Sequence, residues 1–280
     1  MNEAFYYLKD IAKKEDIVFA TSGGELGMIK LGSLLKDRID CKFVVNFRDP
    51  LNYGYMNGLR RDKKFHIGRE KAHEKYMTNA DLILTSSQYY ADVLSDKFTY
   101  LSSKIVNNYF GYITKLDIEK YQRKISQKIN IAYVGSMGVT QSPELLYKSW
   151  KLLDDEGIEL FFIGDISSYK PLQNINDKGV HFINFMPHND FLKFMCENID
   201  VGFPMIGALP DGDGRDIINT QGYGLASRYD DVELLSKNIQ KIKNRSYLAG
   251  IKKKILDDRD SWSMESKILE VDKLLKDMKK

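Results

Sequence analysis

The clearest candidate for chemistry in this sequence is a short run of small residues at 135–138, which reads Gly-Ser-Met-Gly. Apolar residues at 129–134 predict a strand before it, and Pro143 fits the first turn of a helix after it. Small residues let backbone N–H groups approach an anion, and a helix N-terminus adds a partial positive charge. The pattern therefore predicts a turn that binds a diphosphate. The alternative is a tight turn that needs glycine only for its positive φ.

An acidic stretch at 211–216, which reads Asp-Gly-Asp-Gly-Arg-Asp, is a second candidate. It does not fit a calcium-binding loop, because Asp216 replaces the glycine required at the sixth position and Gly222 stands where the bidentate carboxylate belongs. Two readings stay open. The stretch is either a solvated turn with the cap of a short helix at Asp216, or a group of contacts to the hydroxyls of a sugar.

Arg48 and Asp49 follow a strand predicted at 41–47, and parallel sheets bind ligands at the carboxyl ends of their strands. Asp49 has the chemistry to orient an acceptor hydroxyl or to act as a general base. The alternative is an Asp-Pro turn in which Arg48 is the ion partner. His66 lies on the helix predicted next and shares a helical face with His73, but the spacing of the histidines does not match a metal site.

The segment 60–75 is basic, with seven Lys or Arg against three Asp or Glu. An exposed helix face with local ion pairs, such as Lys71 with Glu74, would explain this composition. The functional alternative is docking on an anionic membrane surface. Both readings stay open at the level of sequence.

Short apolar runs alternate with amphipathic helices along the chain, which predicts parallel α/β units. A polar, charged stretch at 112–128 is the expected linker. We therefore expect two Rossmann-like domains facing a cleft, residues 1–118 and residues 119–280, the second with a C-terminal helix. The expected strands lie at 16–20, 41–47, 81–86, 129–134, 158–163, 180–185 and 200–203. The expected helices lie at 27–36, 60–79, 87–97, 187–198 and 262–278, and another has Val232, Leu235, Ile239 and Ile242 on one face.

The bulk composition is that of a folded protein without a strong charge bias. Hydrophobic residues are 43% of the 280 residues and the net charge is +3, which argues against disorder and against nucleic acid as a partner. Cys41 and Cys196 are expected to be buried thiols in a reducing compartment. No cleavable apolar leader is visible, and no apolar run approaches the roughly 20 residues that span a bilayer. The expected location is cytoplasmic, with peripheral attachment to the inner membrane face as an open hypothesis.

Segments in both halves resemble family 4 glycosyltransferases of the GT-B fold, and they occur in the family's order. Residues 133–138, 145–150 and 160–164 resemble the opening of the donor domain, and 43–50 resembles the Arg-Asp-Pro turn of the acceptor domain. Further resemblances lie at 80–87, 180–187, 199–204, 216–225 and 260–278. The resemblance implies transfer of a hexose with retained configuration from a nucleotide-sugar, UDP-sugar favoured, to a glycan or lipid-linked acceptor in surface polysaccharide synthesis.

The resemblance also implies roles for individual residues, with no metal and no cofactor besides the donor itself. The donor-side candidates are Gly135, Ser136, Met137, Gly138, Met186, Pro187, Asp213, Gly214 and Asp216. The acceptor-side candidates are Arg48, Asp49 and His66, and Asp49 is the candidate catalytic residue.

The sequence departs from the family in three places. The units that open the family's first domain are not found, so this domain is expected to be incomplete. The family's Glu-x7-Glu helix does not follow 203–204, and the Arg and Lys that often bind the donor phosphates are missing after Gly138. These departures motivate a second hypothesis, an inactive relic or partner subunit that binds glycan or another transferase. A sugar-nucleotide epimerase is a weaker third, because no cleft motif rich in carboxylates and containing histidine is found.

Overall fold

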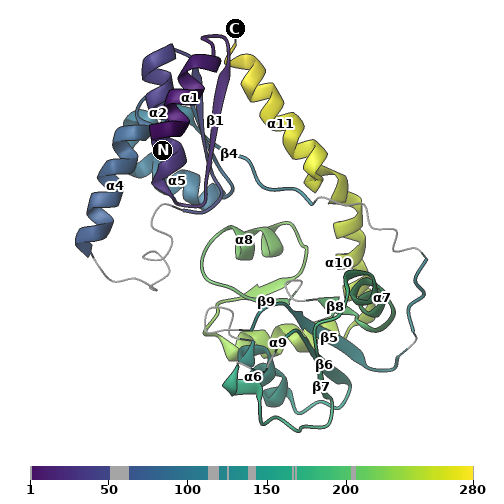
Figure 1. Cartoon of the computed structure of the whole chain (residues 1–280). Coiled ribbons are helices and arrows are strands. Elements are labelled where there is room, and N and C mark those ends of the chain that lie inside the picture. The colour runs from purple at the N-terminus through teal and green to yellow at the C-terminus, as the bar shows by residue number, and fades with distance from the viewer. Residues whose placement is uncertain are drawn as a thin grey trace. The chain divides into compact units, whose positions relative to one another are not determined.

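The computed structural model describes residues 2–50, 63–112, 120–124, 126–137, 143–165, 167, 169–202 and 206–279. The chain divides into two compact units (Figure 1). Unit 1 comprises Met1–Ile113 and Asp260–Lys280, and unit 2 comprises Thr114–Arg259. The sequence predicts a boundary after residue 118 with the last helix in the second domain, whereas the contacts place that helix in unit 1.

Unit 1 contains a sheet of four parallel strands in the order β1-β2-β3-β4. The strands are β1 (Ile17–Ser22), β2 (Lys42–Phe47), β3 (Leu82–Thr85) and β4 (Ile105–Asn107). The first three were predicted. The strands β2 and β3 are buried on both faces and read as continuous apolar runs, whereas β1 is only partly buried. The short β4 was not predicted.

The described helices of unit 1 are α1 (Asn2–Ile11), α2 (Leu26–Ile39), α4 (Lys63–Met77), α5 (Gln88–Lys97), the 3₁₀ helix η1 (Thr99–Lys104) and α11 (Met264–Asp277). Helices α2, α4, α5 and η1 contribute side chains to the core on one face of this sheet and α11 to the core on the other, while α1 contacts α2. Ser87 caps α5, because its side chain accepts a hydrogen bond from the backbone N–H of Tyr90. The apolar face of α11 packs against Val44, Leu82 and Leu84, and burial of this face explains why the last helix belongs to unit 1.

His73 of α4 is completely buried, and its Nδ1 lies 2.7 Å from the carbonyl oxygen of Arg69. Burial lowers the pKa of His73, so the folded state favours the neutral ring. Because the folded pKa lies below the unfolded value of about 6.5, unit 1 should lose stability as the pH falls through that value. We expect His73→Gln to flatten this acid loss, measured by urea unfolding between about pH 7 and pH 5. An unchanged slope would contradict the prediction.

Unit 2 contains four parallel strands in the order β7-β6-β5-β8 and a separate parallel pair, β9 with β10. The strands are β5 (Ile129–Val134), β6 (Ile158–Ile163), β7 (Val180–Ile183), β8 (Val201–Gly202), β9 (Ile206–Ala208) and β10 (Leu225–Ser227). The strand order reverses at β5, since β6 lies on one side of it and β8 on the other. Ligands of open α/β sheets bind at the carboxyl ends of strands beside such a switch point.

The helices of unit 2 are α6 (Glu144–Leu153), α7 (His188–Asn198), α8 (Asp213–Thr220), α9 (Val232–Ile242) and α10 (Arg245–Asp258), with the 3₁₀ helix η2 (Lys170–Leu172). A further 3₁₀ turn, η3 (Arg259–Trp262), precedes α11. The predicted apolar face of α9 is confirmed for Leu235, Ile239 and Ile242, which are fully buried against the sheet core. The helix α10 was not predicted.

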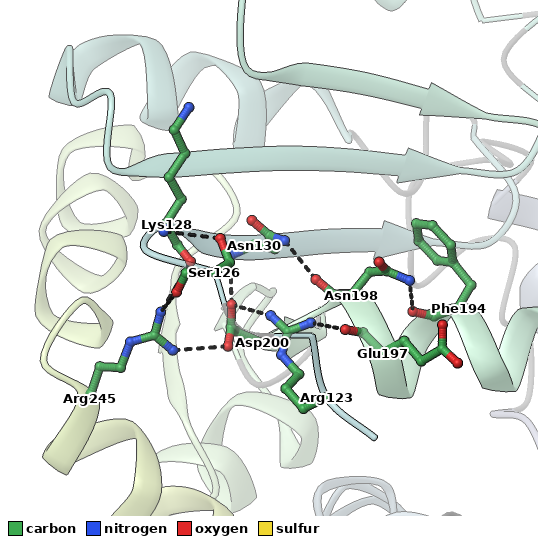
Figure 2. Close-up of polar contacts among 9 residues, drawn as sticks. All are labelled: Arg123, Ser126, Lys128, Asn130, Phe194, Glu197, Asn198, Asp200 and Arg245. Atoms are coloured by element: carbon green, nitrogen blue, oxygen red, sulfur yellow. Dashed lines mark hydrogen bonds and ion pairs between the residues drawn. The ribbon is translucent and has the colours of Figure 1, made fainter. Parts of the chain in front are cut away.

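At the amino ends of β5 and β8, Asp200 is buried and lies at the centre of a polar network (Figure 2). It accepts hydrogen bonds from the Arg123 side chain at 2.6 Å and from the backbone N–H of Asn130 at 3.0 Å. Arg245, at the start of α10, lies 3.3 Å away and also donates to the carbonyl oxygen of Ser126. Asp200 therefore joins the segment before β5, the sheet and α10 within unit 2.

The cysteines differ from each other in burial. Cys41 is fully buried, as expected, whereas Cys196 is only partly buried because α7 buries no residue completely. Burial raises the pKa of both thiols. In the described part of the chain, none of the helices combines the length and apolar character needed to cross a membrane.

Candidate nucleotide-binding site

The turn after β5 is fixed in place by the neighbouring turn after β6. Gly135 has φ +132° and Gly164 has φ +144°, backbone conformations that residues with a side chain rarely adopt. A Cβ added to Gly164 would lie 2.4 Å from the carbonyl oxygen of Gly135, so the two backbones touch. By contrast, a Cβ on Gly135 would meet no atom within 4 Å. Gly164 is therefore required for packing, while Gly135 borders open space.

Tyr133, in the strand that precedes the turn, stabilises the backbone of the turn. Its hydroxyl donates a hydrogen bond to the carbonyl oxygen of Ser136 at 2.8 Å, and the Met137 side chain is buried in the core. Burial, with a smaller effect from Glu144, raises the pKa of Tyr133, so the hydroxyl remains a donor at neutral pH. The backbone of the turn is thus held in position from its own strand.

A cavity of about 680 Å³ opens at the carboxyl ends of β5 and β6. Its lining is mainly apolar, with a carboxylate and an imidazole. The lining residues are Val134, Gly135, Ser136, Met137, Ile163, Gly164, Asp165, Phe185, Met186, His188 and Phe191. Phe185 is 86% exposed, and its ring is available to a planar ligand. Such a volume and lining suit a small organic molecule held by a few polar groups.

The cavity brings together part of the predicted donor side. Gly135, Ser136, Met137 and Met186 line it. Pro187 precedes α7 as its N-cap and is not among the lining residues, and Gly138 lies outside the described residues.

The carboxylate and the imidazole of the cavity, Asp165 and His188, were not predicted as site residues. Asp165 lies two residues after the carboxyl end of β6, and His188 is the first residue of α7. Their positions were visible as strand ends in the sequence, but the neighbouring strands had to be known before these residues could be assigned to one cavity.

The acidic stretch at 211–216 lies elsewhere in unit 2. Asp213, Gly214 and Asp216 form the first turn of α8, and none of them lines the cavity. The predicted cap at Asp216 is wrong, since the N-cap is Gly212, whose φ of +141° favours glycine. Arg215 forms an ion pair with Asp211 four residues earlier. A contact of these residues with donor hydroxyls stays a prediction.

Arg48 and Asp49 lie at the carboxyl end of β2, as predicted. A Cβ added to Gly23 would lie 3.0 Å from Arg48 Nη2, 3.1 Å from Asp49 Oδ2 and 3.3 Å from Glu25 Oε1. Three charged groups therefore converge on Gly23, and sequence reasoning missed Glu25. Hydrogen bonds from its own backbone N–H and that of Gly23 lower the pKa of Glu25, so its carboxylate is ionised at neutral pH. The backbone of His66 belongs to α4, but its side chain is outside the described part.

The basic segment 60–75 is described only in part. Glu70 forms an ion pair with Lys97 at 2.6 Å, and Glu74 accepts a hydrogen bond from Tyr100 at 3.1 Å in place of the expected pair with Lys71. Docking of this segment on a membrane stays a prediction. Across the described residues, no group of three His, Cys, Asp or Glu side chains is arranged to hold a metal ion.

No protein-family model and no curated protein sequence matches this chain. Solved structures do match it. HepE of Anabaena in complex with UDP is 12% identical, with a TM-score of 0.73, and the match covers 99% of this chain and 81% of HepE. A glycosyltransferase of Rickettsia africae is 14% identical, with a TM-score of 0.72, over 99% of this chain and 80% of that chain. The lipopolysaccharide outer core galactosyltransferase WaaB is 12% identical, with a TM-score of 0.63, over 94% of this chain and 74% of that chain.

These matches establish the fold. The two parallel α/β units of this chain have the GT-B fold of the glycosyltransferases, as the sequence resemblance implied. At this level of identity the likeness concerns the fold, and function has to be argued from the site.

Proposed function

We propose that the protein is a glycosyltransferase that takes a sugar from a nucleotide-sugar donor. The single observation that supports this most is the position of the cavity. It opens beside the strand at which the order of the unit 2 sheet reverses, and the turn at Gly135 and Ser136 borders it. Structural neighbours such as HepE bind UDP, which favours a UDP-sugar as the donor.

In this proposal the turn stabilises the leaving diphosphate. The backbone N–H groups of Ser136 and Met137, held in advance by Tyr133 and Gly164, need little reorganisation when negative charge develops on the leaving group, whereas the N–H of Gly135 already donates to the carbonyl oxygen of Ile163. The same contacts hold the donor in one orientation, which lowers the entropic part of the barrier. The donor is the substrate, and the proposal invokes no separate metal or cofactor.

We further propose that the transfer retains the sugar configuration and moves a hexose, as in family 4. The acceptor is a glycan or lipid-linked molecule of surface polysaccharide synthesis, bound by unit 1 near Arg48 and Asp49. The protein works in the cytoplasm, and the basic excess of segment 60–75 supports docking on the anionic inner leaflet.

A second candidate function is a partner subunit that binds glycan or another transferase without turnover. One observation favours it. Among the described residues, no Lys or Arg lines the cavity, so no cationic side chain is seen there to neutralise a diphosphate. Nucleotide binding separates the two candidates.

The test is calorimetric titration of the wild-type chain with UDP, with GDP as the comparison. We expect UDP to bind with micromolar affinity. We expect Gly135→Leu to weaken binding by about 30-fold or more, because a side chain there would occupy the open space and displace N–H groups worth about 2 kcal/mol. No heat from either nucleotide with a cooperatively folded protein would exclude the enzyme and favour the partner subunit.

Gly222→Leu is the matched control for Gly135→Leu. Gly222 also has positive φ, at +73°, and an added Cβ would also meet no atom within 4 Å, but it does not line the cavity. Both substitutions therefore place a side chain at a positive φ, with the smaller backbone strain at Gly222, whose φ lies nearer the left-handed helical region. Only a loss specific to Gly135 supports binding at the turn.

A further inference from the structure

Asp165 is exposed to the cavity and is the one carboxylate among its described lining residues. It follows Gly164 at the carboxyl end of β6. Because Gly164 packs directly on the carbonyl of Gly135, Asp165 stands beside the turn proposed for the diphosphate. A negative side chain so close to that turn is unfavourable unless it faces a part of the ligand that carries hydrogen-bond donors.

The strand topology indicates which part of a bound nucleotide would face Asp165. In Rossmann sheets the phosphate-binding turn follows the first strand of the unit, and an acidic residue further along the chain hydrogen-bonds the ribose hydroxyls. In unit 2 the first strand is β5 and the second is β6, its hydrogen-bonded neighbour. Asp165 at the end of β6 therefore has the position of the ribose-binding acid.

The state of the carboxylate fits this role. The backbone N–H of Ser167 donates to Asp165 Oδ1 at 2.8 Å, which orients the group. The Ser167 hydroxyl, followed by this N–H, lowers the pKa of Asp165 below its usual value. An ionised carboxylate has about four acceptor positions, so it can still accept from two vicinal hydroxyls.

We propose that Asp165 binds the 2′ and 3′ hydroxyls of the donor ribose and sets the preference for ribonucleotides. This inference rests on the proposed function, since it requires a nucleotide in the cavity.

The test compares UDP with 2′-deoxy-UDP by calorimetric titration of the wild-type chain and of Asp165→Asn. The substitution keeps the size of the side chain and removes its charge, and Asp165 is exposed, so folding should be unaffected. We expect the wild type to prefer UDP by about tenfold, the usual value of a hydrogen bond to a charged group. We expect Asp165→Asn to weaken UDP binding by about the same factor and to reduce the preference to about threefold or less, because the remaining amide oxygen accepts only a neutral hydrogen bond.

Asp230→Asn is the matched control, because Asp230 is exposed, pairs with Arg228 on the surface and lies outside the cavity. It should keep both the affinity and the preference. If the wild type binds neither UDP nor GDP, the proposed function itself is excluded. If the wild type binds UDP without preferring it over the deoxy form, or if Asp165→Asn keeps the preference, the ribose inference is overturned and the proposed function stands.

Discussion

Replacing Gly164 with alanine is expected to lower the free energy of unfolding of unit 2 by about 3 kcal/mol and to remove nucleotide binding. The new Cβ would lie 2.4 Å from the carbonyl oxygen of Gly135, so the two turns would have to separate. The φ of +144° adds backbone strain that alanine cannot relieve. Chemical unfolding and titration with UDP measure the two effects.

Gly250→Ala is the control for this substitution. Gly250 lies inside α10, and an added Cβ would meet no atom within 4 Å. Alanine in a helix interior is favoured over glycine by about 0.5–1 kcal/mol, so this variant should be more stable and should bind UDP normally. A Gly164→Ala protein as stable as the wild type would show that the two turns do not touch as described.

Replacing Asp200 with alanine is expected to destabilise unit 2 by about 2–3 kcal/mol. The substitution leaves the buried N–H of Asn130 without its acceptor, and it leaves the guanidinium groups of Arg123 and Arg245 without their counter-charge. The side chains of Arg123 and Arg245 are 31% and 53% exposed, so water can solvate their charges after the substitution. The loss of stability is therefore smaller than for a fully buried ion pair. Urea unfolding followed by circular dichroism measures the change.

Asp230→Ala removes a comparable ion pair with Arg228, but at the surface, and should change the stability by less than about 0.5 kcal/mol. Amide hydrogen exchange adds a local readout. In Asp200→Ala, protection should fall first in the segment before β5 and at the start of α10, because Asp200 joins these to the sheet. Equal stability of the two variants would contradict the central role of Asp200.

Much of the sheet architecture followed from local pattern. The strands β2, β3 and β5 are buried on both faces, and their apolar runs are therefore continuous enough to be recognised. The strand β6 was also recognised, although its second face is only partly buried. Three short strands were not recognised. The three residues of β4, of β9 and of β10 carry too little periodicity, and only pairing with a neighbour makes them strands.

The helix α10 was missed for a related reason. Its sequence contains Gly250 and a run of three lysines, and only Leu248 and Ile251 are buried, so its apolar face is narrow. Its stability as a helix depends on contacts such as the one from Arg245 to Asp200, which no local pattern shows. The last helix, α11, was predicted as a helix but not as part of unit 1, because its apolar face does not specify the sheet on which it packs.

The sequence by itself determined the parallel α/β class, the GT-B resemblance and the turn at Gly135 and Ser136, because strand runs, glycine and helix starts are local properties. Only the tertiary structure decided that Asp165 and His188 share a cavity with that turn, and that the acidic residues of α8 do not line it. The reason is physical. Residues far apart in the chain meet only where strands lie side by side, and strand order is set by packing of the whole unit.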